Sequence, residues 1–253
     1  MAILLGNDDG VDAPGLKALA EALEGLDDLY IAAPSQNRSG VGNGITVDRP
    51  VTARRHSAWP GVKERTSVDG TPADAIKYGL QYLLGGTPPR LVVTGINHGP
   101  NIGRNIRCSG TLGAAYEAFM YGFPALAVSV DHGEPPLWDA SRHYARLVAE
   151  KTLILARERR ELILNLNVPR LPLASVKGLR FARHGHGGYQ DVLVATGHDQ
   201  YSIGGEWRNL PGEEDSDSMA LAEGYAVLTP LTYELTDQPL LARLQVEWSD
   251  IAH

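Results

Sequence analysis

The chain of 253 residues contains only one cysteine, Cys108. A single cysteine excludes an internal disulfide and cannot supply a structural zinc site built from paired cysteines. No apolar run is long enough to span a bilayer, and the residues after Met1 show neither the basic region nor the cleavage site of a secretory signal. We therefore expect a protein of the cytoplasm, where thiols stay reduced.

Positive charge is also scarce, because 23 Lys and Arg stand against 30 Asp and Glu, for a net charge of -7. Proteins that bind nucleic acid backbones neutralise the phosphates with clustered Lys and Arg, so no nucleic acid partner is expected. Small phosphorylated ligands stay open, since local donors or a metal suffice to bind them. The length and the 43% hydrophobic fraction are those of a globular protein with a sizeable core.

Short apolar runs alternate with helical patterns over the first 170 residues. Strands are expected at 2–5, 30–33, 91–94, 124–130 and 162–168, and helices at 15–23, 73–84, 112–121 and 142–157. This alternation is typical of parallel strands joined by crossover helices. The sequence therefore predicts an α/β fold with a doubly wound, mostly parallel sheet between two helical layers, as in Rossmann-like proteins.

Beyond about residue 170 the chain is rich in glycine turns and strand-like pieces. These pieces lie at 179–182, 192–195, 200–203 and 226–230, and a closing helix is expected at 238–246. No low-complexity linker separates them from the first half. We predict a single domain over 1–253, with a core of about 1–170 and 224–235, a protruding arm of about 178–215 formed as a β-hairpin extension, and a C-terminal helix of about 237–247. Protruding arms often serve contacts between subunits.

Two adjacent carboxylates, Asp8 and Asp9, follow the first expected strand directly. In an open α/β sheet, ligands bind beyond the carboxyl ends of the strands. Neighbouring carboxylates repel each other unless a cation or strong donors hold them, and Mg²⁺ or Mn²⁺ is the natural partner of such oxygens. The alternative is a plain turn in which Asp9 caps a helix.

A polar, glycine-rich loop at 34–44 follows the second expected strand. Its glycines would let backbone N–H groups approach a phosphate. Arg38 can offset anionic charge there, while Ser39 and Asn43 offer oxygen ligands or hydrogen-bond donors. A flexible surface loop without a ligand is the alternative interpretation.

A third polar loop, at 94–103, places Asn97 and Asn101 between glycines after the third expected strand. It runs on to Ser109, Gly110 and Thr111, which open the next expected helix. The free N–H groups and the positive dipole end of that helix would face a bound anion. Ser109 is the expected N-cap, a role that is compatible with a phosphate contact.

Other local patterns are assigned to architecture. Thr71 is the expected N-cap of a helix with proline at its first position, and Asp74 in its first turn can face the site. The chain has no P-loop, no G-x-S-x-G elbow and no arginine six positions after Cys108, which excludes three standard hydrolase and phosphatase sites. His184 and His186, in a glycine-rich turn, are expected to be exposed loop residues rather than metal ligands.

Five motifs occur in one order along the chain: N-D-D-G at 7–10, N-R-S-G at 37–40, G-T-P-A-D at 70–74, G-I-N-x-G-x-N-x-G at 95–103 and S-G-T at 109–111. Together they resemble the SurE family of nucleotidases, and Asp217 with the segment 224–231 is similar to the closing pattern of that family. The chain departs from the family at Asn105 and Cys108, where Asp and Tyr are usual.

The resemblance implies one divalent metal ion, Mg²⁺ or Mn²⁺, in each subunit. It implies the following site residues: metal ligands Asp8, Asp9, Ser39 and Asn97; phosphate contacts Asn43, Asn101, Ser109, Gly110 and Thr111; and catalytic residues Asp9, Asp8, Asn97 and Ser109. The ligands would all be hard oxygens, as such cations require.

The resemblance further implies a 5'-nucleotidase, a phosphomonoesterase that hydrolyses nucleoside 5'-monophosphates, and 3'-monophosphates as well, with a metal-activated water. It implies a homodimer or homotetramer assembled through the C-terminal arm. Two alternatives stay open. One is a binding protein that senses a nucleotide or phosphate without turnover, and the other is a metal-dependent hydrolase of another phosphorylated small molecule or of short polyphosphate.

Overall fold

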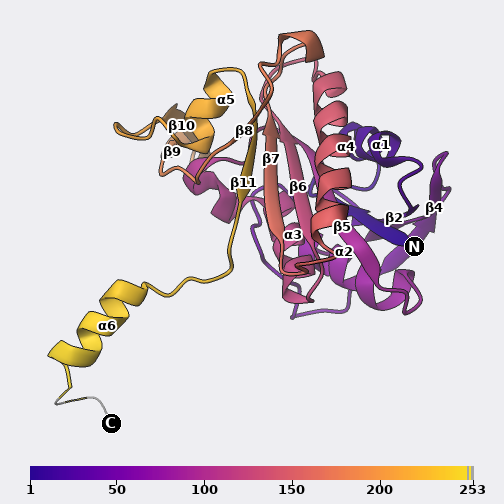
Figure 1. The fold of residues 1–253 in the computed structure, drawn as a ribbon, viewed down its shortest axis with the longest axis horizontal. Coiled ribbons are helices and arrows are strands. Elements are labelled where there is room, and N and C mark those ends of the chain that lie inside the picture. Colours follow the sequence, from indigo (N-terminus) through magenta and orange to yellow (C-terminus); the bar gives the residue numbers. More distant parts are fainter. Residues whose placement is uncertain (250, 252–253) are drawn as a thin grey trace.

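A computed structural model of the protein describes residues 1–249 and 251 (Figure 1). The strands are β1 (Ala2–Gly6), β2 (Asp28–Pro34), β3 (Ala53–His56), β4 (Val62–Val68), β5 (Pro89–His98), β6 (Ala125–Val130), β7 (Ile163–Val168), β8 (Leu179–Phe181), β9 (Gly188–Gly197), β10 (Gln200–Arg208) and β11 (Ala226–Pro230). The helices are α1 (Pro14–Leu23), α2 (Pro72–Tyr78), α3 (Gly110–Met120), α4 (Trp138–Leu155), α5 (Asp217–Ala222) and α6 (Gln238–Glu247), with a 3-10 helix at Gly103–Cys108.

Nine strands form one sheet in the order β3-β4-β2-β1-β5-β6-β7-β11-β8. The six strands from β4 to β7 in this order are parallel, whereas β3 runs antiparallel to β4 and β11 antiparallel to β7. From the central β1 the chain continues to β2 on one side, and β5 lies on the other. The predicted doubly wound, mostly parallel α/β sheet is therefore confirmed, and its topological switch point lies at β1.

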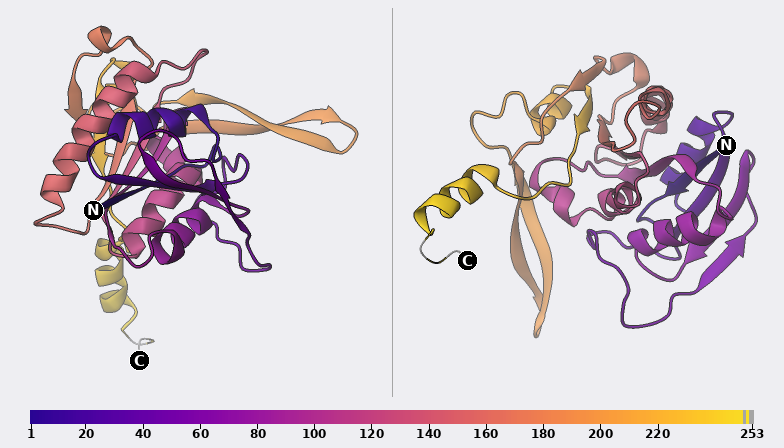
Figure 2. Two further views of the ribbon diagram at one scale, coloured as in Figure 1. Left: turned by 90° about the vertical axis from the view of Figure 1, so that its right-hand side faces the viewer. Right: turned by 60° about the horizontal axis from the view of Figure 1, so that its bottom comes forward.

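Helices cover both faces of the sheet, with α1 and α4 on one face and α2 and α3 on the other (Figures 1 and 2). Strand β1 shows how the sequence builds the two cores. Ile3 and Leu5 pack toward α1 and α4, and Leu4 between them packs toward α2 and α3. Burial on both faces explains why the central strands are continuous apolar runs.

The helix starts assigned to architecture are confirmed. Thr71 and Asp74 form a capping box at the start of α2, and the Ser109 side chain accepts the N–H of Leu112 at the start of α3. Burial alone would raise the pKa of Asp74, but hydrogen bonds from Thr46 and Thr71 hold it below its ordinary value. Asp74 therefore anchors the loop after β2 to α2.

Among the strands and α-helices, β3, β4 and α5 were not predicted from the sequence. Strand β4 carries Lys63, Glu64 and Arg65 in succession, so it lacks the apolar signature of the inner strands. Its charges are paired near the sheet edge, as in the Arg55–Glu64 ion pair of 2.6 Å. The segment expected at 179–182 within the arm instead joins the main sheet as β8, because it pairs with β11, a partner distant in sequence.

The arm and the C-terminal helix extend away from the sheet. Strands β9 and β10 pair antiparallel as a long hairpin that projects from the body (Figure 2). Helix α6 lies apart from the sheet at the end of an extended segment, and none of its residues is buried (Figure 1). Among residues 1–249 and 251, no helix combines the length and the apolar character needed to cross a membrane.

Candidate active site at the switch point

Asp8 and Asp9 follow β1 at the switch point of the sheet. Backbone hydrogen bonds join this loop to the loop after β2: the N–H of Arg38 donates to the Asp8 carbonyl at 2.7 Å, and the N–H of Val11 donates to the Pro34 carbonyl at 2.8 Å. The first two polar loops predicted from the sequence are therefore neighbours in the fold, at the place where α/β proteins bind ligands.

Asp8 is buried against the first turn of α3. Thr111 Oγ1 donates a hydrogen bond to Asp8 Oδ1, and the backbone of Gly110 and Thr111 also hydrogen bonds to this carboxylate. A Cβ atom on Gly110 would lie only 2.7 Å from the Cβ of Asp8, so glycine is needed for this approach. Burial nevertheless raises the pKa of Asp8, because these bonds offset only part of the lost hydration.

Asp9 is half-buried beside Asp8. Burial, together with the negative charge of Asp8, raises the pKa of Asp9 to about 6, although hydrogen bonding from the His98 backbone opposes the shift. Two ionised carboxylates side by side repel each other, and a bound cation would relieve this repulsion. The pair Asp8 and Asp9 therefore fits a cation. Among residues 1–249 and 251 no group of three or more His, Cys, Asp and Glu forms a metal cluster, so a cation here needs further oxygen ligands.

Ser39 and Asn97 are the two further metal ligands that the resemblance implies. Ser39 is exposed in the loop that Arg38 ties to Asp8, and Asn97 lies on β5 directly before His98. The Asn97 side-chain nitrogen donates to the Gly99 carbonyl at 2.6 Å, which leaves its oxygen available to a cation. Within the described part of the chain, neither side chain hydrogen bonds to Asp8 or Asp9, so the four-ligand set stays a prediction.

We predict that Asp9 makes the metal-free protein less stable as the pH rises. Its folded pKa of about 6 lies above the ordinary 3.8, so the folded chain binds this proton more tightly than the unfolded chain does. The free energy of unfolding of the parent should therefore fall as the pH rises from about 4 to about 6. Asp9→Asn has no carboxylate to ionise, so its free energy of unfolding should fall by about 1–2 kcal/mol less over this range, with solvent screening taken into account. Urea unfolding with chelator at pH 4 and pH 7 measures it.

The matched control for this prediction is Asp48→Asn, which changes an exposed carboxylate in the next loop. The gain in stability of Asp9→Asn over the parent should appear at pH 7 and vanish at pH 4. If Asp9→Asn were more stable than the parent by the same amount at both pH values, or less stable at pH 7, ionisation of Asp9 would not be what destabilises the metal-free protein.

Four of the five residues proposed to contact phosphate lie at or beside the start of α3, and Asn101 does not. Ser109 caps the helix, and Asn43 lies beside Gly113, because a Cβ on that glycine would come within 3.0 Å of Asn43 Oδ1. Asn101 is buried, and its side-chain nitrogen donates to Ser129 Oγ at 2.9 Å. The backbone of Gly110 and Thr111 faces Asp8. Asn101 therefore shapes the loop from within, whereas Asn43 and Ser109 border open space.

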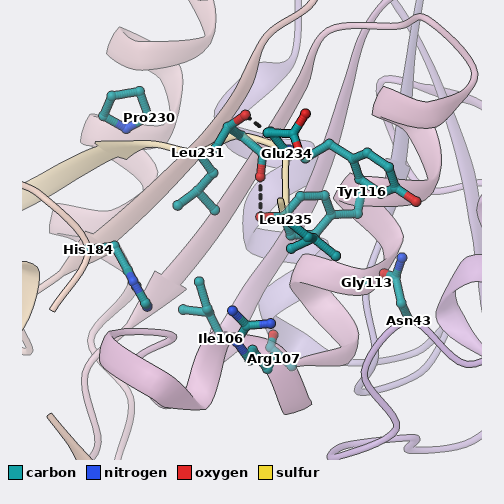
Figure 3. Close-up of a pocket in the computed structure, with 13 residues that line it drawn as sticks. Asn43, Ile106, Arg107, Gly113, Tyr116, His184, Pro230, Leu231, Glu234 and Leu235 are labelled. Atoms are coloured by element: carbon teal, nitrogen blue, oxygen red, sulfur yellow. Dashed lines mark hydrogen bonds between the residues drawn. The ribbon is translucent and has the colours of Figure 1, made fainter. Parts of the chain in front are cut away.

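A pocket of about 380 Å³ opens from Ser109 and Asn43 (Figure 3). It is bounded by the 3-10 helix, by α3 and by the segment after β11, and its lining is Asn43, Ile106, Arg107, Ser109, Gly113, Tyr116, His184, Pro230, Leu231, Thr232, Tyr233, Glu234 and Leu235. Its volume is that of a pocket for a small organic ligand. The pocket combines aromatic and aliphatic side chains with polar groups such as Asn43, Arg107 and His184, which lie on different sides of it (Figure 3).

Residues at the base of the arm, His184 and Asp217, form hydrogen bonds to Gly103 in the loop that carries Asn101. The sequence did not predict this role. The fully buried Asp217 accepts the N–H groups of Gly103 and Gly185, both at 3.1 Å, and burial raises its pKa. His184 Nε2 donates to the Gly103 carbonyl at 2.7 Å. The expectation that His184 is an exposed loop residue was wrong, because it is half-buried and lines the pocket, whereas His186 is exposed as expected.

Comparison with known proteins gives one family. The model of the family described as "Survival protein SurE" matches residues 3–191. One similar relative is the "5'-nucleotidase SurE" of Carboxydothermus hydrogenoformans, which is 38% identical over 97% of this chain and 95% of the relative. Another is the "5'/3'-nucleotidase SurE" of Proteus mirabilis, which is 38% identical over 98% of this chain and 96% of the relative. The crystal structure of the SurE protein from Aquifex aeolicus superposes with a TM-score of 0.84 at 32% identity, covering 98% of this chain and all of that one.

Proposed function

Because the chain belongs to the SurE family, we propose that it is a 5'-nucleotidase, a metal-dependent phosphomonoesterase that converts nucleoside 5'-monophosphates, and 3'-monophosphates as well, to nucleoside and phosphate. The observation that carries the proposal is the pair Asp8 and Asp9 at the switch point, against the start of α3. The names of the relatives supply the substrate class, and the site supplies the chemistry.

The proposed cation is one Mg²⁺ or Mn²⁺ in each subunit, held by oxygens of Asp8, Asp9, Ser39 and Asn97. Carboxylate, hydroxyl and amide oxygens suit such hard cations. When bound, the cation polarises a phosphoryl oxygen and lowers the pKa of a water molecule.

The structure supports different roles for the two carboxylates. Asp8 is fixed by Thr111 and by the backbone at the start of α3, which suits a rigid ligand. Asp9 is less enclosed than Asp8, which suits a group that can reach the attacking water, orient it and take its proton. We propose in-line attack of this water on phosphorus, without a covalent intermediate: the bond from the water oxygen to phosphorus forms, the bond from phosphorus to the nucleoside oxygen breaks, and the leaving oxygen takes a proton from solvent.

Ser109, Asn43 and the helix start would receive the phosphate, and the adjoining pocket would receive the nucleoside (Figure 3). The Ser109 hydroxyl lies at the positive end of α3, where negative charge is stabilised. Tyr116 and Leu231 offer the flat and apolar surface that a base requires. Asn97 and Ser109 would stabilise the phosphoryl oxygens during the reaction. Gly110, which has no side chain, allows Asp8 to lie close to the start of α3.

We further propose that the chain forms one domain that assembles as a homodimer or homotetramer through the arm and the C-terminal helix. Exposed apolar side chains on these elements support assembly, since monomeric proteins rarely display such patches. Those on the hairpin and the C-terminal segment include Val192, Leu193, Tyr201, Ile203, Leu235, Leu240, Leu241 and Val246.

A phosphate-release assay tests the proposed function. With Mn²⁺ or Mg²⁺, the protein should release phosphate from a panel of nucleoside monophosphates, and an excess of chelator should abolish release until metal is restored. Release from short polyphosphate alone would instead favour a different phosphohydrolase. Binding of nucleotide without any release, with metal present, would favour the sensing function.

A further inference from the structure

A second cavity, of about 410 Å³, lies between the loops after β1 and β2 and the edge strands β3 and β4. It shares no residue with the pocket of Figure 3. Its lining consists of Val11, Asp12, Ser35, Gln36, Thr52, Arg54, His56, Ser67 and Asp69. Eight of these nine side chains are polar, and the volume is sufficient for a small organic ligand.

One wall of this cavity is fixed by Arg65, whose side chain is almost completely buried. Its guanidinium donates to the Val11 carbonyl at 3.3 Å and to Asp12 Oδ1 at 2.5 Å, and its Nε donates to the Ser57 carbonyl at 3.0 Å. The same guanidinium lies over the ring of Trp59, 4.5 Å from its centre. Arg65 therefore holds the 11–12 turn against β4, so this wall of the surface cavity is fixed by a buried side chain.

The unpaired charge that lines the cavity is positive. Asp12 forms an ion pair with Arg65, and Asp69 forms one with Arg49 at 3.3 Å. Arg54 takes part in no ion pair within the described part of the chain, and it lines the cavity from β3. The Arg54 guanidinium is exposed in this cavity, and as the charge there that no described carboxylate neutralises it favours an anionic ligand.

Side chains that can donate hydrogen bonds line the same cavity as Arg54. His56 Nε2 and Ser67 Oγ are 2.8 Å apart across β3 and β4, and the hydroxyls of Ser35 and Thr52 line the same space. Guanidinium, imidazole and hydroxyl groups together form the donor set that recognises phosphate oxygens, with arginine able to donate two parallel bonds.

We propose that this cavity is a second binding site, separate from the active site, for a phosphorylated small molecule of nucleotide size. Its phosphate group contacts Arg54 and His56. Asp12 lies three residues after Asp9, and Gln36 lies three residues before Ser39, so a ligand here contacts both loops that carry the proposed metal ligands. This inference does not depend on the proposed function, because it rests on a different set of side chains.

Equilibrium dialysis of labelled AMP against the full-length protein, with chelator present to prevent turnover, tests the second site. Arg54→Gln should bind one AMP fewer per chain than the parent, or bind it at least about tenfold more weakly there. The matched control is Arg55→Gln, since Arg55 is the next residue on β3, points to the other side of the strand and pairs with Glu64. It should bind as many AMP molecules as the parent.

Competition then identifies the recognised group. Inorganic phosphate should displace the Arg54-dependent AMP, and adenosine should not. Equal binding by Arg54→Gln and the parent, or displacement by adenosine as effective as by phosphate, would overturn the second site. Hydrolysis by Asp9→Asn at the parent rate would overturn the proposed function instead, and it would leave the Arg54-dependent binding untouched.

Discussion

Asp9→Asn should lower kcat for nucleotide hydrolysis by about a thousandfold with saturating Mn²⁺. The substitution keeps the size of the side chain but removes the group that takes the proton of the attacking water, and general bases contribute about 10²–10⁴-fold. It also removes one of the two negative charges proposed to hold the cation. Initial rates of phosphate release over a range of Mn²⁺ concentrations measure both effects, since weaker metal binding raises the metal requirement and loss of the base lowers the plateau.

The control for this experiment is Asp12→Asn, which changes a carboxylate in the same loop. Asp12 is exposed and pairs with Arg65 rather than with the proposed metal. Its variant should retain kcat within a few-fold of the parent. Parent-like turnover by Asp9→Asn at saturating metal would show that another group activates the water.

Gly110→Ala should cost about a hundredfold or more in kcat/KM, although it adds a single methyl group. The new Cβ would lie 2.7 Å from the Asp8 Cβ and 2.9 Å from its Oδ2, so either Asp8 or the start of α3 must move. A displacement of about 1 Å in a catalytic group is enough for a loss of this size. Alanine is otherwise the better helix former by about 1 kcal/mol, so poor helix propensity cannot explain a loss.

The control is Gly197→Ala in the arm, which adds the same methyl group away from the site. The nearest atom to the new Cβ belongs to the side chain of Gln200, which is flexible and can move aside. It should leave kcat/KM unchanged. Steady-state kinetics and thermal unfolding of both variants separate a local displacement from a general loss of stability. If Gly110→Ala were as active as the parent, the close contact of α3 with Asp8 would not matter for catalysis.

The inner half of the fold could be predicted because its signals are local. Continuous apolar runs mark strands buried on both faces, and caps such as Thr71 and Ser109 mark the helix starts. The polar edge of the sheet could not be predicted in the same way. Strand β4 is stabilised by ion pairs and by the buried Arg65, which a hydrophobic pattern does not reveal.

In the candidate site, too, some residues could be predicted from the sequence and others could not. The rule that ligands bind at the carboxyl ends of parallel strands led directly to Asp8 and Asp9. The same rule says nothing about Asp217, which lies far along the chain and reaches the loop at Gly103 through the base of the arm. Sequence spacing also cannot show that Asn101 turns inward to Ser129, because that contact depends on the register of β5 and β6.

The most direct test of the central claim is the anomalous diffraction of crystals grown with Mn²⁺. We predict one strong peak per chain, within coordination distance of oxygens from Asp8, Asp9, Ser39 and Asn97 and next to the start of α3. A Mn²⁺ ion bound elsewhere on the chain, with Asp8 and Asp9 making no contact to it, would contradict the claim.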